Sequence, residues 1–375
     1  MKGFENVKRK LGFGAMRLPM FSETEPDMKQ ITEMVDCFME RGYNYFDSAF
    51  TYLGGHSEEY LGKALVSRYP REDFLLATKS PMFEPTPQSE LYKRIDVQRG
   101  RYGTDYFDYY LLHNIAGVRE KYFRENGAWE FLSDVKEKGI VKHIGFSFHD
   151  GPEMLDRLLT EHPEVDFVQL QINYMDWFNE TVRSKDNYEV AVKHGKPVIV
   201  MEPIKGGSLM GMPKEISDIF KKANPDMSFA QWALRYVISL ENVAVVLSGM
   251  STIEQMRENT EFMKDERVLT DDEQKVIDQV REAMGKVPIV GCTACRYCTE
   301  VCPVGIKIPE LIAGYNDYIR YGEAGGRSAY MMNAVRSGVA PSECLECHAC
   351  EGNCPQQIEI TKYLKEMTRL YGNVK

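Results

Sequence analysis

From about residue 10 to residue 250, short apolar runs rich in β-forming residues alternate with amphipathic stretches of helical period. Helical patterns fill the gaps between the runs, as at 56–69, 128–139 and 228–240. Eight of the apolar runs have the length and composition of buried strands. They span residues 11–16, 43–49, 74–80, 107–113, 142–147, 166–171, 197–202 and 243–248. A strand-then-helix alternation repeated eight times predicts an α/β fold in which a parallel sheet closes into a (β/α)8 TIM barrel.

The pattern changes in the last quarter of the chain. Residues 270–285 read as a final amphipathic helix that Thr270 caps, and residues 286–291 read as a linker. The rest of the chain has mostly helical patterning and the small size of domains that metal sites stabilise. We therefore predict a barrel domain over residues 1–285 and a small, mostly helical domain over residues 286–375.

Composition limits the classes of partner. The chain has 375 residues, of which 46 are basic and 56 acidic, so its formal net charge is −10. No basic cluster offsets this charge, and we expect neither nucleic acid nor an anionic membrane as a partner. The chain contains no run of 18 apolar residues, and its start lacks the apolar segment of a signal peptide. We therefore expect a cytoplasmic protein.

Eight of the nine cysteines fall into two runs that share the spacing C-x2-C-x2-C-x3-C-P. They are Cys292, Cys295, Cys298 and Cys302 in the first run and Cys344, Cys347, Cys350 and Cys354 in the second. Thiolates this close in sequence can share one metal centre but are badly placed for pairwise disulfides. Zinc sites usually pair two C-x2-C elements across a longer gap, whereas this spacing matches the bacterial ferredoxin run. The spacing therefore predicts iron–sulfur clusters.

The domain over residues 286–375 thus resembles a two-cluster ferredoxin module. The resemblance implies two 4Fe–4S clusters, each held by three cysteines of one run and the fourth cysteine of the other. The implied sets are Cys292, Cys295, Cys298 and Cys354 for one cluster and Cys344, Cys347, Cys350 and Cys302 for the second.

Four polar side chains fall where predicted barrel strands end. Asp47 ends the second strand, Lys79 the third and His113 the fourth, and Tyr52 lies in the loop five residues beyond Asp47. The functional residues of a barrel gather at the carboxyl ends of its strands. A neighbouring ammonium lowers the pKa of a phenol, so Lys79 would make Tyr52 a usable proton donor. With Asp47 holding Lys79 and His113 binding the substrate oxygen, these residues predict carbonyl reduction.

Residues 8–265 also resemble the aldo-keto reductase family. The likeness lies in GFGAMRLP (12–19), DSAFTY (47–52), the lysine of LATKS, the histidine of YYLLH, GFS (145–147), Q-x-x-x-N (169–173), EPIKGG (202–207) and SGMSTIEQMRENT (248–260). The resemblance implies a (β/α)8 barrel, NADH or NADPH across its mouth and reversible reduction of a small-molecule aldehyde or ketone. It also implies a catalytic tetrad of Asp47, Tyr52, Lys79 and His113, in agreement with their chemistry.

The resemblance further implies a set of nucleotide contacts. Ser147 and Gln169 would bind the nicotinamide amide, and Met201 takes a place where the family often has a stacking aromatic residue. The remaining implied contacts are Ser251, Arg257 and Asn259. NADPH-specific members carry Lys, Ser and Arg in the loop after the eighth strand, where this chain has no basic residue before Arg257. Because phosphate recognition favours Arg or Lys, we expect no strict preference for NADPH and rank NADH at least equal to it as the cofactor.

A hydride carries two electrons together, whereas a 4Fe–4S cluster passes one, and three interpretations follow. In the first, the barrel is a working carbonyl reductase and the clusters stabilise the tail or report redox state. In the second, a flavin in the barrel or on a partner splits the electron pair, and the chain is an electron-transfer oxidoreductase. In the third, the barrel is a scaffold and the tail docks a redox protein. The complete tetrad argues against the third; we adopt the first for its chemistry and leave the electron path open.

Overall fold

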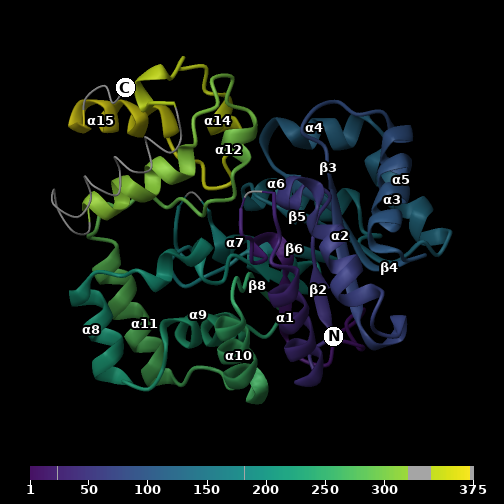
Figure 1. Ribbon diagram of the computed structural model, residues 1–375, viewed down its shortest axis with the longest axis horizontal. Helices are drawn as coiled ribbons and strands as arrows, with labels where there is room; N and C mark the ends of the chain where they lie inside the picture. The colour runs from purple at the N-terminus through teal and green to yellow at the C-terminus, as the bar shows by residue number, and fades with distance from the viewer. Residues whose placement is uncertain (23, 181, 320–338, 372–375) are drawn as a thin grey trace. The chain divides into compact units, whose positions relative to one another are not determined.

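The computed structural model describes residues 1–22, 24–180, 182–319 and 339–371 (Figure 1). Eight parallel strands close into a barrel in which each strand pairs with the next in sequence and β8 pairs with β1. They are β1 (Leu11–Gly14), β2 (Tyr45–Asp47), β3 (Leu75–Pro81), β4 (Phe107–Ile115), β5 (Val141–Phe148), β6 (Phe167–Gln171), β7 (Val198–Met201) and β8 (Val243–Ser248). The predicted TIM barrel is therefore confirmed.

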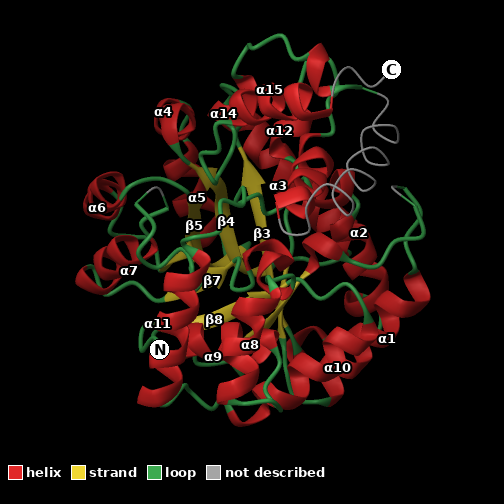
Figure 2. Cartoon of the chain, turned by 90° about the vertical axis from the view of Figure 1, so that its left-hand side faces the viewer, coloured by secondary structure: helices red, strands yellow, loops and turns green. Residues whose placement is uncertain are grey.

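The chain divides into two compact units, one of residues 1–203 and 230–269 and the other of residues 204–229 and 270–375. The first unit contains all eight strands, and its helices surround them (Figure 2). The main helices that lie wholly or almost wholly in it are α1 (Met28–Glu40), α2 (Ser57–Leu61), α3 (Gln88–Tyr102), α4 (Gly117–Glu125), α5 (Ala128–Glu137), α6 (Pro152–Glu161), α7 (Ser184–Lys193), α9 (Phe229–Ile238) and α10 (Ile253–Phe262). In the described part of the chain, no helix is both long enough and apolar enough to cross a membrane.

Aromatic side chains fill the interior of the barrel. Tyr45, Tyr109 and Phe167 are fully buried there together with Phe4 of the N-terminal segment. The ring centroids of Phe4 and Tyr109 are 5.0 Å apart, and those of Phe4 and Phe167 are 5.7 Å apart. The Phe167 ring fits because the residue beside it on β5 is Gly145, which has no side chain. An ideal Cβ on Gly145 would lie 2.6 Å from the carbonyl oxygen of Phe167. Gly145 is thus required by packing.

The second unit combines the β7–β8 connection with the last quarter of the chain. Its helices are α8 (Lys214–Ala223), α11 (Asp271–Met284), α12 (Tyr297–Glu300), α14 (Ala349–Gly352) and α15 (Ile360–Tyr371), and residues 308–319 are also helical. Thr270 caps α11 in a capping box with Glu273, as the sequence predicts. Helix α8 packs against α11. At Gly206, an ideal Cβ would lie 2.5 Å from the carbonyl oxygen of Thr293, so the connection runs in close contact with the first cysteine loop.

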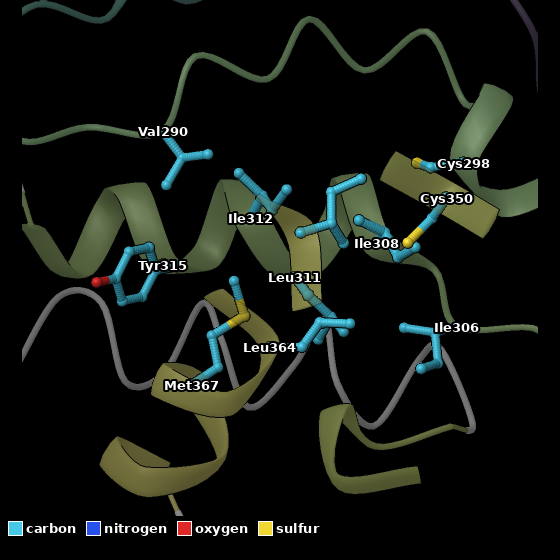
Figure 3. Close-up of a cluster of buried hydrophobic side chains, with 11 residues drawn as sticks. Val290, Cys298, Ile306, Ile308, Leu311, Ile312, Tyr315, Cys350, Leu364 and Met367 are labelled. Atoms are coloured by element: carbon cyan, nitrogen blue, oxygen red, sulfur yellow. The ribbon is translucent and has the colours of Figure 1, made fainter. Parts of the chain in front are cut away.

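A small hydrophobic core holds the cysteine runs in this unit (Figure 3). Ile308, Leu311 and Ile312 pack with Leu364 and Met367, the latter two from α15. The cysteines at the third position of each run, Cys298 and Cys350, are 7% exposed and belong to the same core. Apolar packing therefore anchors both cysteine runs in this unit.

We predict that Gly145→Ala destabilises the barrel by roughly 1–3 kcal/mol, because the added methyl meets backbone of β6 that cannot yield easily. The measurement is the urea midpoint followed by tryptophan fluorescence, since all three tryptophans lie in the first unit. Gly100→Ala is the matched control. Gly100 lies within α3 with open space around its Cα, so alanine there should leave the midpoint unchanged or raise it. Equal midpoints for both variants would contradict the packing argument.

Candidate active site and cysteine cavities

An ion pair between Asp47 and Lys79 lies buried where β2 and β3 end. Asp47 is in register with Ala77 on the neighbouring strand, and Lys79 follows Ala77 by two residues on the same face. The Lys79 Nζ lies 2.5 Å from Asp47 Oδ1 and donates a second hydrogen bond to the carbonyl oxygen of Ser48 at 2.7 Å. Lys79 is 0% and Asp47 2% exposed. Burial lowers the pKa of Lys79, and the carboxylates of Asp47 and Glu58 oppose that shift.

Tyr52 and His113 lie next to this pair. Tyr52 is partly exposed and begins a 3-10 turn, Tyr52–Gly55, in which Leu53 takes a left-handed backbone with φ +53°. The Nζ of Lys79 is 5.0 Å from the ring centroid of Tyr52. The imidazole of His113 meets the same ring edge-on, with the centroids 5.6 Å apart. The structure therefore brings together all four residues that the strand ends predict.

A bulge in the ladder lies next to His113. The register between β4 and β5 shifts between Leu112 and Ile115, and Asn114 within this interval has φ +66°. His113 is 2% exposed. Burial, reinforced by the nearby Lys79 charge, holds the pKa of His113 well below its ordinary value. The imidazole is therefore neutral at physiological pH and can donate one hydrogen bond to a substrate oxygen.

Ser147 and Gln169 are direct neighbours on β5 and β6, where their Cα positions are in register. Both are buried. The Ser147 Oγ accepts a hydrogen bond from the backbone N–H of Asn114 at 2.7 Å, which leaves its hydroxyl proton free to be donated. The Gln169 Oε1 is buried and has no hydrogen-bond partner within the described residues. A buried acceptor beside a hydroxyl donor fits a carboxamide such as that of nicotinamide.

The other predicted nucleotide contacts lie on β7 and around α10. Met201 ends β7 and is partly exposed. The backbone N–H of Ser251 donates to a glutamine side chain of α10. The guanidinium of Arg257 pairs with Glu33 at 2.6 Å, and the Asn259 amide donates to a β8 hydroxyl at 3.1 Å. The side chains of Arg257 and Asn259 are therefore already engaged by the chain itself.

Two cavities lie within the cysteine-bearing unit. In each, three cysteines of one run are joined by one cysteine of the other. The cysteines that line the first are Cys292, Cys295, Cys298 and Cys354, and those that line the second are Cys302, Cys344, Cys347 and Cys350. No group of three His, Cys, Asp or Glu side chains in the described residues converges on a single-ion site, and the cysteines instead line these two cavities. Four soft sulfur donors around such a space suit an iron–sulfur cluster.

The two cysteine loops have the same backbone conformation. Ala294 in the first and Glu346 in the second both have φ +54°. In this left-handed turn the N–H of Ala294 lies 3.4 Å from the Sγ of Cys292, and the N–H of Glu346 lies 3.4 Å from the Sγ of Cys344. Backbone N–H groups aimed at sulfur stabilise a thiolate and the negative charge of a bound cluster.

A buried polar group that the strand ends do not predict lies behind Lys79. Glu58 and Gln98 are 0% exposed, and Arg101 pairs with Glu58 at 2.9 Å. A signal was present in the helical pattern, because Glu58 precedes Leu61 by three residues on α2 and Gln98 lies between Ile95 and Tyr102 on the buried stripe of α3. A polar residue at an apolar position of a helix face indicates a buried hydrogen-bond network.

Two known protein families match the chain, one over the barrel and one over the cysteine runs. The model of the "Aldo/keto reductase family" matches residues 10–282, and the "4Fe-4S dicluster domain" matches residues 291–359. The chain is 26% identical over 300 residues to the uncharacterized oxidoreductase YqkF of Bacillus subtilis, covering 71% of this chain and 90% of that protein. It is 25% identical over 267 residues to L-galactose dehydrogenase of Arabidopsis thaliana, covering 66% and 82%.

Solved structures of aldo-keto reductases are similar to the chain as well. The holo form of aldo-keto reductase AKR11C1 from Bacillus halodurans matches with a TM-score of 0.59 at 26% identity, covering 72% of this chain and 91% of that one. An aldo-keto reductase from Klebsiella pneumoniae in complex with NADPH matches with a TM-score of 0.58 at 18% identity, covering 72% and 90%. The second likeness is one of fold alone.

Proposed function

The chain belongs to the aldo/keto reductase family, and we propose that it reduces an aldehyde or ketone to an alcohol with NADH or NADPH. The observation that carries the proposal is the buried Lys79–Asp47 pair, whose ammonium lies 5.0 Å from the Tyr52 ring. When bound, the reduced nicotinamide supplies the hydride to the carbonyl carbon. Tyr52 gives its phenolic proton to the carbonyl oxygen, and the Lys79 charge stabilises the phenolate that remains.

The other two members of the tetrad position these groups. Asp47 holds Lys79 in place and keeps it charged. The neutral imidazole of His113 donates a hydrogen bond to the substrate oxygen and fixes the face of the carbonyl that receives the hydride. Ser147 and Gln169 would bind the carboxamide of the cofactor, with Met201, Ser251 and Asn259 as further contacts. The guanidinium of Arg257 pairs with Glu33, so a 2′-phosphate would have to compete with that carboxylate, and NADH ranks at least equal to NADPH as the cofactor.

The cysteine-bearing region, residues 286–375, holds two 4Fe–4S clusters in this proposal, with one cluster in each cavity. The ligand sets are crossed between the runs, which is supported by the four cysteines that line each cavity. Clusters of this kind supply one-electron transfer, and a docking redox protein is their proposed exchange partner. Reduced cysteines on this scale are typical of a cytoplasmic location.

Tyr52→Phe is expected to lower kcat/KM for carbonyl reduction by about 10²-fold or more, because phenylalanine has no proton to give. Activity is measured with full-length protein that retains its clusters. Tyr92→Phe is the matched control, since Tyr92 lies on α3 and its hydroxyl donates to Asp134 of α5. Iron content and nucleotide binding should be unchanged in both variants. Turnover by Tyr52→Phe close to that of the control would remove Tyr52 from the acid role.

Crossed ligation predicts which cysteine variants resemble each other. Cys354→Ala should lose the cluster that Cys298→Ala loses, although Cys354 belongs to the same run as Cys350. Iron content should fall by about half in each case, and the electron paramagnetic resonance of the remaining reduced cluster identifies which one is lost. A spectrum of Cys354→Ala that matches Cys350→Ala would instead assign one whole run to each cluster.

Anaerobic addition of NADH or NADPH alone should leave the visible absorbance of the clusters unchanged, because a hydride delivers two electrons together and each cluster accepts one. Cofactor should be consumed only after an aldehyde is added. Bleaching before the aldehyde would favour the electron-transfer interpretation and require a one-electron gate such as a flavin.

A further inference from the structure

A fully buried carboxylate lies behind the tetrad, and the proposed reaction does not use it. Glu58 sits in the first turn of α2 with 0% exposure. Its Oε1 accepts hydrogen bonds from the Thr78 hydroxyl and from the Gln98 amide, both at 2.6 Å. Its Oε2 accepts from the Arg101 guanidinium at 2.9 Å. Such a carboxylate is costly to bury, so its retention calls for a role.

The partners of Glu58 lead directly to Lys79. Thr78 is the residue before Lys79 on β3, and it is 0% exposed. The same Gln98 amide donates to the carbonyl oxygen of Lys79 at 3.2 Å, and Tyr110 donates to the Gln98 Oε1 at 2.7 Å. Glu58 therefore fixes the backbone from which the tetrad lysine projects.

A second branch reaches the loop that carries Tyr52. The Arg101 guanidinium donates to the carbonyl oxygen of Phe50 at 3.0 Å and lies 4.4 Å from the Phe50 ring centroid. The N–H of Phe50 in turn donates to the carbonyl oxygen of Lys79 at 3.0 Å. Close packing supports this branch, because an ideal Cβ on Gly62 of the same helical segment would lie 2.6 Å from the carbonyl oxygen of Arg101. One carboxylate thus ties Lys79 and the Tyr52 loop together.

We propose that Glu58 is a positioning residue for the proton-donating pair: it fixes Lys79 relative to Tyr52 and supplies part of the negative charge that keeps the lysine protonated. The inference rests on the proposed function, since it concerns the same proton transfer. The charge role agrees with the direction in which Glu58 acts on the pKa of Lys79. The titratable groups that face this region are Asp47, Lys79, Arg101, Tyr102, Tyr110 and His113.

The test compares Glu58→Gln with Glu59→Gln. Glu59 is the next residue of α2, but its side chain is 39% exposed and pairs with His56. In Glu58→Gln, loss of a negative charge makes it easier for Lys79 and Tyr52 to lose protons. We expect kcat/KM for carbonyl reduction to fall about tenfold or more and its basic limb to move to lower pH. Glu59→Gln should leave both unchanged.

Glu58→Asp separates charge from geometry. It keeps the carboxylate but shortens its reach, so we expect a lower rate with the basic limb near its wild-type position. Tryptophan fluorescence verifies that each variant is folded. A rate loss in Glu58→Gln with no movement of the basic limb would overturn the charge role. Wild-type kinetics in Glu58→Gln would overturn the inference entirely.

A second measurement needs no substrate and so separates this inference from the proposed function. The ultraviolet absorbance of tyrosinate is titrated in wild type and Glu58→Gln, each compared with its own Tyr52→Phe counterpart. The difference isolates Tyr52, whose ionisation should occur at lower pH in Glu58→Gln. A shift in a protein that reduces no carbonyl would refute the proposed function and leave the role of Glu58 standing. An unshifted titration in an active reductase would refute the charge role of Glu58 alone.

Discussion

The rest of the active site depends on burying one ammonium group. An isolated Lys79 cation inside the barrel would cost several kcal/mol in lost hydration, and the Asp47 carboxylate at 2.5 Å offsets that cost. Two neighbouring parallel strands supply the pair, because Asp47 and Lys79 lie near the carboxyl ends of adjacent strands on the same face. The same burial makes Lys79 responsive to every nearby charge. A lysine in water would be too strongly screened to influence Tyr52.

Much of this arrangement could be predicted from the chain alone. The eight strands were visible because buried parallel strands read as continuous apolar runs, and their ends located Asp47, Lys79 and His113. The grouping of the nucleotide residues was harder to predict. Whether Arg257 faces a phosphate or pairs with Glu33 depends on how α1 and α10 pack, and no local pattern encodes that contact.

Glu58 and Gln98 show a second limit to what the sequence pattern predicts. Each lies on a helix that the pattern finds, but a single polar residue on an apolar stripe does not name its partner. The hydrogen bonds of Glu58 join α2, α3 and β3, elements separated by 20 to 43 residues in sequence. Contacts of this range follow from the closure of the barrel. Polar residues at apolar positions therefore indicate that a hydrogen-bond network exists. Which residues that network holds in place depends on the fold.

The cysteine-bearing unit is discontinuous in sequence, since it includes residues 204–229 as well as the end of the chain. Gly206 lies against Thr293, and α8 packs on α11. The C-terminal segment, residues 270–375, is thus only one of the two segments that make up this compact unit. A gene fusion joined at residue 286 would transplant the cysteines without the segment that backs their first loop.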